Sequence, residues 1–258
     1  MNKKIKKIIN KKKKSKIVCL TAYSKNIAAE VDKHADITLV GDSLGSVLYN
    51  YTTTRNVTLT EMINHSKSVR LGINKSLMVV DMPFKTYETN TSALKNAKKI
   101  IKETKCDAVK LEGGKKIIKQ INYLIKNKIP VMGHLGLLPQ SAKGKFKSKG
   151  KTTKEINQLV SDALLLQKNG VFAIVLECIK EPVAKKITKN LQIPTIGIGS
   201  SIHCDGQVLV TDDLIGLNQT SIKFVKKFCN TKKYINFGIK KFAKAVRTKK
   251  YPTKKYSY

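Results

Sequence analysis

The sequence predicts an α/β protein that folds as a single (β/α)8 TIM barrel, and three observations favour that fold. The 258 residues match the roughly 250 that one such barrel needs. Eight short apolar runs, each bounded by a polar or Gly-containing cluster, have the length and β-branched content of buried parallel strands. Segments with helical spacing lie between these runs, and this alternation is typical of a parallel sheet.

The expected strands follow one another at residues 17–20, 37–40, 77–80, 108–111, 130–132, 173–176, 195–198 and 207–210. The expected helices begin after a cap at Ser24, then run over residues 60–73, 91–105 (with Thr91 as the cap), 115–126 and 155–168. Eight strands can close a barrel, but the same pattern fits an open doubly wound sheet. That open sheet is the structural alternative.

The chain is expected to form one domain over residues 1–258, with the barrel core at about 17–217, because no Pro/Gly/Ser-rich linker divides it. A hydrophobic content of 41% excludes a disordered chain. The lysine-rich residues 1–16 lack the apolar stretch of a secretory signal and are expected to form a partly helical or frayed lead-in. Beyond the core, residues 221–228 have helical spacing, and residues 249–258 are expected to form a mobile basic tail.

The formal net charge of +34 is the most unusual number in the composition. Such a charge attracts polyanions, so binding to nucleic acid or to a membrane surface is one interpretation. However, only Arg55, Arg70 and Arg247 carry the guanidinium group that phosphate and base recognition favours. The lysines are spread along the whole chain, which favours the compositional bias of an A/T-rich genome. We therefore expect no specific nucleic-acid partner and, in the absence of a long apolar run, no membrane partner.

The five cysteines form no CxxC pair and no even framework. This usage is typical of reduced thiols in a cytoplasmic protein. The sequence therefore predicts a cytoplasmic location.

Side chains that can carry chemistry follow successive strands. Asp42, Asp81, Glu112, His134 and Glu177 each lie at or just beyond the C-terminal end of an expected strand, where barrel active sites are built. One Asp in such a place is also a common helix cap. Three carboxylates on neighbouring strands, however, would repel one another unless a cation neutralised them. Oxygen ligands of this kind suit Mg²⁺ and not zinc, so Asp42, Asp81 and Glu112 predict a magnesium site.

Three further side chains are candidates for roles at this mouth. Lys110 precedes Glu112 by two positions, so both should face the barrel interior, and we favour a charge pair over Schiff-base formation. Glu177 has apolar neighbours, which suits a general base, although it could instead cap a helix or pair with a lysine. His134 could donate to a substrate oxygen or brace the backbone.

The strings that contain these residues resemble the ketopantoate hydroxymethyltransferase family. They begin at residues 21 (TAY), 39 (LVGDSLG), 81 (DMPF), 109 (VKLEGG), 133 (GHLGLLPQ), 175 (VLEC), 193 (IPTIGIGS) and 205 (DGQVLV), in one consistent order. The chain departs from the family at Ser200 and Ser201, where Ala-Gly is common, and in the loop over residues 140–154, an expected lid. These departures affect the lid and the folate contacts.

The resemblance implies a cytoplasmic barrel enzyme, typically a homo-oligomer and often a decamer. It implies transfer of a hydroxymethyl group from the reduced folate 5,10-methylenetetrahydrofolate to the 2-oxo acid 3-methyl-2-oxobutanoate, giving 2-dehydropantoate for pantothenate biosynthesis. At matching positions it implies Mg²⁺ ligands at Asp42, Asp81 and Glu112, substrate contacts at Asp42, Ser43, Asp81 and Lys110, and a proton acceptor at Glu177.

Two other functions compete with this interpretation. Another Mg²⁺-dependent carbon–carbon lyase or aldolase for 2-oxo acids would use a similar barrel, but the KKCGH-type motif of isocitrate-lyase-like enzymes does not occur in the sequence. A basic nucleic-acid-binding protein would explain the charge. It would leave the ordered acidic residues at the strand ends unexplained.

Overall fold

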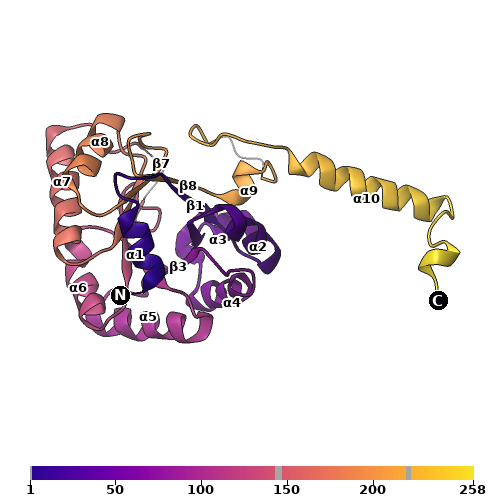
Figure 1. Ribbon diagram of the computed structural model, residues 1–258, viewed down its shortest axis with the longest axis horizontal. Helices are drawn as coiled ribbons and strands as arrows, with labels where there is room; N and C mark the ends of the chain where they lie inside the picture. Colours follow the sequence, from indigo (N-terminus) through magenta and orange to yellow (C-terminus); the bar gives the residue numbers. More distant parts are fainter. Residues whose placement is uncertain (1, 143–146, 219–221) are drawn as a thin grey trace. The chain divides into compact units, whose positions relative to one another are not determined.

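The structure, a computed structural model, describes residues 2–142, 147–218 and 222–258. The chain divides into two compact units, residues 1–210 and 211–258. In the first unit, parallel strands follow one another around a closed barrel in sequence order, and β1 pairs with β8 to complete it. Helices surround the strands (Figure 1). The predicted (β/α)8 barrel is therefore confirmed, and the open sheet is excluded.

The strands are β1 (Ile17–Thr21), β2 (Ile37–Val40), β3 (Leu77–Asp81), β4 (Ala108–Glu112), β5 (Val131–Gly136), β6 (Ala173–Glu177), β7 (Thr195–Ile198) and β8 (Gly206–Leu209). Each coincides with a predicted apolar run. Every residue of β2, β3 and β4 is buried, because the barrel interior covers one face and the helices cover the other. β5 extends further than predicted, and the extension brings His134 into the strand.

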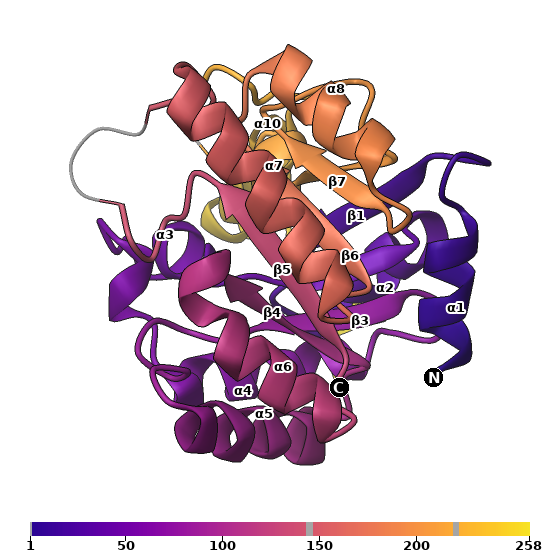
Figure 2. The same cartoon turned by 90° about the vertical axis from the view of Figure 1, so that its left-hand side faces the viewer.

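The outer helices are α2 (Lys25–His34), α4 (Leu59–Arg70), α5 (Asn90–Thr104), α6 (Ile118–Lys126), α7 (Thr153–Lys168) and α8 (Glu181–Asn190); the short α3 (Leu44–Leu48), η1 (Thr54–Asn56) and η2 (Lys115–Ile117) lie between them. Figure 2 shows α6, α7 and α8 along the outside of the barrel. Ser24 precedes α2 as predicted but makes no side-chain cap hydrogen bond. The cap of α5 is Thr89, not Thr91, because Thr89 forms a capping box with Ser92.

The basic lead-in forms a regular helix, α1 (Lys3–Asn10), which Asn2 caps. Its Ile5 and Ile8 are almost completely buried and belong to the same apolar cluster as residues of the barrel strands. Burial of these two side chains explains why a segment so rich in lysine is ordered. The lead-in therefore closes the end of the barrel where the strands begin.

The second unit contains α9 (Thr211–Leu214), α10 (Thr231–Arg247) and η3 (Lys254–Tyr256). The helix predicted over residues 221–228 is wrong for residues 222–228, which form a turn and no helix; residue 221 lies outside the described residues. The long α10 was missed because Gly238 and several β-branched and aromatic residues lower its helix propensity. Throughout the described ranges, no helix is both long and apolar enough to span a membrane.

Candidate active site

The predicted acidic residues converge on the C-terminal mouth of the barrel. Asp81, Glu112 and Glu177 are the last residues of β3, β4 and β6, and Asp42 lies two residues beyond β2. The strand register sets Asp81 beside Lys110, and it sets Glu112 beside His134. The closed barrel thus brings together side chains that are far apart in the sequence.

Lys110 lies between two of the carboxylates. Its Nζ is 3.1 Å from Asp81 Oδ2 and 3.9 Å from Glu112 Oε1, and all three side chains are buried. Burial lowers the pKa of Lys110, but Asp81, Glu112 and Asp42 raise it more, so the net shift is upward. A Schiff base requires the neutral amine, so this geometry favours the charge pair.

The carboxylates hold more negative charge than Lys110 can neutralise. Burial, then Glu112 and Asp81, raise the pKa of Asp42 well above its usual value. Burial is also the main reason that the pKa of Asp81 is raised. Burial acts on Glu112 in the same direction, but His134 and Lys110 lower the pKa of Glu112 more. A cation at this mouth would relieve the repulsion.

His134 links a predicted metal ligand to the predicted base. Its Nδ1 is 3.3 Å from Glu112 Oε1, and its Nε2 is 3.1 Å from Glu177 Oε2. Burial and Lys110 lower the pKa of His134, but Glu112 and Glu177 raise it more, to about 9. The ring lies within the acidic cluster, between Glu112 and Glu177.

The backbone turn after His134 fixes the position of Glu177. Gly136 ends β5 with a φ of +101°, a backbone conformation that residues other than Gly rarely adopt. A Cβ at Gly136 would collide with the carbonyl oxygen of Glu177. That carbonyl accepts a hydrogen bond from the N–H of Leu137 at 2.9 Å. The glycine thus allows β5 to approach the end of β6 closely.

The oxygen atoms of the mouth show how well it fits a metal ion. Across the described parts of the chain, no group of three or more His, Cys, Asp or Glu side chains is already gathered to hold an ion. Lys110 and Gln140 contact the carboxylates instead. However, Asp81 Oδ1 is buried and has no hydrogen-bond partner among the described residues, which is costly for a carboxylate oxygen. The all-oxygen donor set fits Mg²⁺, and the assignment of its ligands stays a prediction.

Ser43 lies at the edge of the same site. It follows Asp42 directly and is only partly buried. Its hydroxyl shares a hydrogen bond of 2.7 Å with the hydroxyl of Tyr23, from the residues that follow β1. This hydroxyl therefore borders the mouth next to Asp42, as a substrate contact would.

Gln140 is a buried residue of the site that the sequence analysis missed. Its Nε2 donates to Asp42 Oδ2 at 2.8 Å and to the carbonyl oxygen of Met82 at 3.0 Å. Its backbone N–H donates to Glu112 Oε2 at 3.1 Å, and its Oε1 accepts from the hydroxyl of Tyr87 at 2.5 Å. The sequence indicated a role for Gln140 only through its place at the end of the family string GHLGLLPQ. Gln140 also begins the expected lid, of which residues 143–146 lie outside the described residues.

A closed (β/α)8 barrel with buried carboxylates, an ammonium group and a histidine at its C-terminal mouth defines a barrel enzyme with an acidic site. The family model for ketopantoate hydroxymethyltransferase matches residues 2–254 of the chain. The chain therefore belongs to the ketopantoate hydroxymethyltransferase family, which are transferases of pantothenate biosynthesis.

Individual relatives agree with this assignment. The chain is 62% identical over 258 residues to the 3-methyl-2-oxobutanoate hydroxymethyltransferase of Pelagibacter ubique (strain HTCC1062), with 100% of both chains covered. It is 46% identical over 246 residues to the enzyme of the same name from Rhizobium etli, covering 94% of this chain and 90% of the relative. The resemblance seen in the strand-end strings is therefore confirmed.

Solved structures share the fold at low sequence identity. A 2,3-dimethylmalate lyase, a member of the PEP mutase/isocitrate lyase superfamily, superposes with a TM-score of 0.61 at 10% identity, covering 98% of this chain and 99% of its own. A phosphonopyruvate hydrolase superposes with a TM-score of 0.62 at 8% identity, covering 95% of this chain and 87% of its own. At such identities the likeness is one of fold.

Proposed function

We propose that this chain transfers a hydroxymethyl group from 5,10-methylenetetrahydrofolate to 3-methyl-2-oxobutanoate, giving 2-dehydropantoate, with Mg²⁺ as its cofactor. The observation that carries the proposal is the convergence of Asp42, Asp81, Lys110, Glu112 and Glu177 on one mouth of the barrel. This convergence occurs in a chain that is 62% identical to a relative named for this reaction.

Asp42, Asp81 and Glu112 would hold the Mg²⁺ ion. When bound, the ion supplies electrostatic stabilisation of the negative charge that develops on the keto oxygen of the substrate. The unpaired oxygen of Asp81 and the raised pKa of Asp42 support this assignment. A phosphonopyruvate hydrolase of the same fold is a complex with oxalate and Mg²⁺, a ligand pair of the kind proposed here.

Lys110 and Ser43 would bind and orient the 2-oxo acid together with Asp42 and Asp81. Lys110 contributes a buried positive charge, which attracts the carboxylate of the substrate. Ser43 contributes a hydroxyl at the edge of the mouth. These contacts would set the C3–H bond of the substrate toward Glu177, because orientation of the reacting groups is a major source of catalysis.

Glu177 would accept the C3 proton. Its side chain is 15% exposed, more than those of Glu112 and His134, so a substrate can reach it. His134 lies 3.1 Å from Glu177 Oε2 and would hold the carboxylate in one orientation. The carbon that loses the proton would then form the new bond to the one-carbon unit that the folate carries. The bonds from that unit to the folate nitrogens would break, and water would supply its hydroxyl group, so that 2-dehydropantoate and tetrahydrofolate leave.

We also propose that the enzyme is a homo-oligomer, with a decamer as the form that the family resemblance implies. Within its own unit, α10 buries none of its residues. Its exposed apolar side chains are Tyr234, Ile235, Phe237, Ile239, Phe242 and Val246. A surface of this kind is typical of a contact between subunits. Light scattering on the purified protein would give the number of subunits.

A cytoplasmic location stays a prediction. The structure has all five cysteines as free thiols, which fits a reducing compartment.

The proposed base can be tested by exchange of the C3 proton. NMR would follow loss of the C3–H signal of 3-methyl-2-oxobutanoate in D₂O, with and without Mg²⁺ and before the folate is added. Glu177→Gln should abolish exchange while it leaves binding of Mn²⁺, a spectroscopic substitute for Mg²⁺, nearly unchanged. Glu181→Gln is the matched control, because Glu181 is an exposed carboxylate four residues further on. Full exchange by the Glu177 variant would remove Glu177 from this role.

A further inference from the structure

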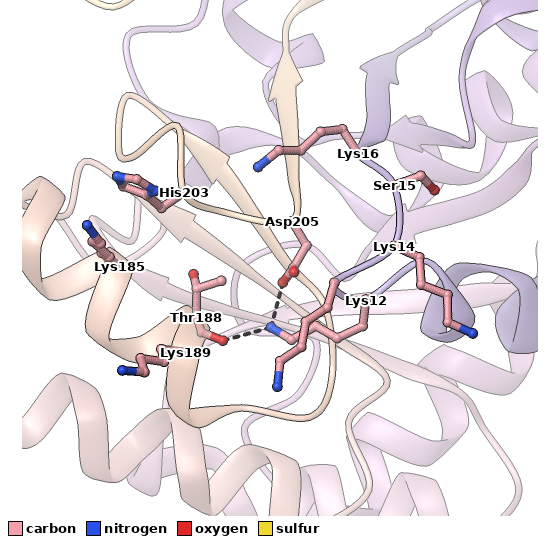
Figure 3. Close-up of a pocket in the computed structure, with 10 residues that line it drawn as sticks. Lys12, Lys14, Ser15, Lys16, Lys185, Thr188, Lys189, His203 and Asp205 are labelled. Atoms are coloured by element: carbon pink, nitrogen blue, oxygen red, sulfur yellow. Dashed lines mark hydrogen bonds and ion pairs between the residues drawn. The ribbon is translucent and has the colours of Figure 1, made fainter.

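A cavity lies at the end of the barrel opposite the candidate active site. Residues 12–16 just before β1, residues 203–205 just before β8, and the last two turns of α8 enclose a volume of about 460 Å³ (Figure 3). These are the N-terminal ends of the strands, whereas the catalytic carboxylates lie at their C-terminal ends. The cavity is therefore separate from the active site.

Lysine is concentrated around this cavity. Six of the ten residues that line it are lysines, whereas the whole chain of 258 residues has 48. The six are Lys12, Lys13, Lys14, Lys16, Lys185 and Lys189. Asp205 is the one acidic residue in the lining. The share of lysine around the cavity is thus higher than in the chain as a whole.

Asp205 is already neutralised by Lys12. Lys12 Nζ lies 2.7 Å from Asp205 Oδ2 and donates to the carbonyl oxygen of Thr188 at 2.8 Å, and the side chains of Lys12 and Asp205 are each 7% exposed. The same carboxylate oxygen accepts from the N–H of Thr195 at 2.9 Å. The floor of the cavity is thus a closed, buried ion pair. It leaves no negative charge for the other lysines.

Four of these lysines have no protein partner among the described residues. In the described residues, no hydrogen bond or ion pair engages the ammonium groups of Lys13, Lys14, Lys185 or Lys189. Lys185 and Lys189 are one helical turn apart on α8, a spacing at which like charges repel each other. Figure 3 shows them on the wall opposite residues 14–16, with Lys12 passing between the two walls.

Two other groups at the cavity have protein partners. Lys16 Nζ donates to the carbonyl oxygens of Ile202 at 2.9 Å and Cys204 at 2.6 Å, which fixes the side chain along the wall. His203 Nε2 is 3.8 Å from the exposed carboxylate of Glu181. The excess positive charge therefore comes from the four lysines without partners.

We propose that this cavity binds a small molecule that carries two or more phosphate groups. Lysine ammonium groups are mobile point charges, so they suit a chain of phosphates better than one planar group in a fixed orientation. The volume lies within the range of small-molecule sites. Because residues 12–16 join α1 to β1, the ligand would also tie the N-terminal helix to α8. This site is independent of the proposed reaction.

Calorimetric titration of the full chain with inorganic tripolyphosphate, at an ionic strength of about 0.15 M, tests the proposal. The Lys185→Ala/Lys189→Ala double variant should raise the Kd about tenfold or more, because it removes two charged donors. The Lys95→Ala/Lys99→Ala double variant is the matched control. It removes the same charge at the same helical spacing from exposed positions of α5, and it should change the Kd about twofold or less.

Further measurements separate the possible outcomes. Tripolyphosphate should raise the Tm of the wild type and of the α5 variant, but not that of the α8 variant. Tighter binding of ATP than of tripolyphosphate would support a nucleotide as the ligand, and equal binding would support recognition of the phosphate chain alone. If both double variants lost the same affinity for tripolyphosphate, or if the wild type did not bind tripolyphosphate, the proposal would be overturned. A single-stranded oligonucleotide could instead bind more tightly than tripolyphosphate and ATP and lose the same affinity in both double variants. That result would assign the positive charge to a nucleic-acid surface.

Discussion

Lys110 Nζ lies 3.1 Å from Asp81 Oδ2, across the adjacent strands β4 and β3, and both side chains are buried. This contact links the only buried lysine ammonium described at the mouth to a carboxylate that we propose as a metal ligand. The pair is stable in the barrel because each charge offsets the desolvation of the other.

Lys110→Met should destabilise the protein by about 3–5 kcal/mol in the absence of metal, because it leaves buried carboxylates without their counter-charge. Added Mg²⁺ should restore part of this loss, since a bound cation would neutralise the same carboxylates. Urea unfolding with and without Mg²⁺ would measure both effects. Lys119→Met, an exposed substitution on α6, should change stability little. Equal stability of the two variants would contradict the role of Lys110.

Gln140→Ala should weaken binding of Mn²⁺ about tenfold or more, because groups that orient metal ligands contribute on this scale. The variant removes the donor that holds Asp42 Oδ2 at 2.8 Å. Electron paramagnetic resonance would report the free Mn²⁺ directly, without an activity assay. Gln158→Ala serves as the control, since Gln158 is exposed on α7 and its side chain donates a hydrogen bond to Asp162, which is not among the predicted metal ligands. Unchanged Mn²⁺ affinity of the Gln140 variant would show that Asp42 needs no such support.

Asp32→Asn should lower stability at neutral pH by roughly 2–3 kcal/mol. Burial raises the pKa of Asp32, but the N–H groups of residues 74–76 and the hydroxyl of Ser76 lower it more, so the net shift is downward. A carboxylate whose pKa is lower in the folded state contributes stability above its unfolded pKa of about 3.9 and loses that contribution as the pH falls toward the folded value. The difference in stability between the wild type and the variant should therefore shrink in urea unfolding as the pH falls below about 3.9. A constant difference from neutral to acidic pH would contradict this account.

Ile8→Ala should destabilise the barrel by about 2–5 kcal/mol, because the side chain is 2% exposed and fills the apolar cluster at the N-terminal end. Thermal unfolding would detect the change as a lower Tm. Lys7→Ala alters the neighbouring exposed position of α1 and should have a small effect. If the Ile8 variant unfolded like the wild type, α1 would be a frayed lead-in and not a closure of the barrel.

The strands could be predicted because both of their faces are buried, so each appears in the sequence as a continuous apolar run. The acidic residues of the site could be predicted for a related reason, since a parallel barrel presents all of its C-terminal strand ends on one side. Helix boundaries were less accurate, as at Thr89, because a cap depends on local hydrogen bonds that neighbouring threonines can also make. In the second unit, residues 222–228 had helical spacing, but none of them is buried, and an apolar helix face that stays exposed adds little stability to a helix.

By itself, the sequence determined the strands and their alternation with helices, the family and the identity of the acidic residues that follow the strands. Only the structure showed that the sheet closes into a barrel. The tertiary structure alone decided which of these residues touch. In the folded chain, Lys110 contacts Asp81 and Gln140 contacts Asp42. Ile5 packs against the strands at the N-terminal end of the barrel, and lysines from distant segments line one cavity. The physical reason is that strand patterns are local properties of the chain, whereas these contacts join residues that only the closure of the barrel brings together.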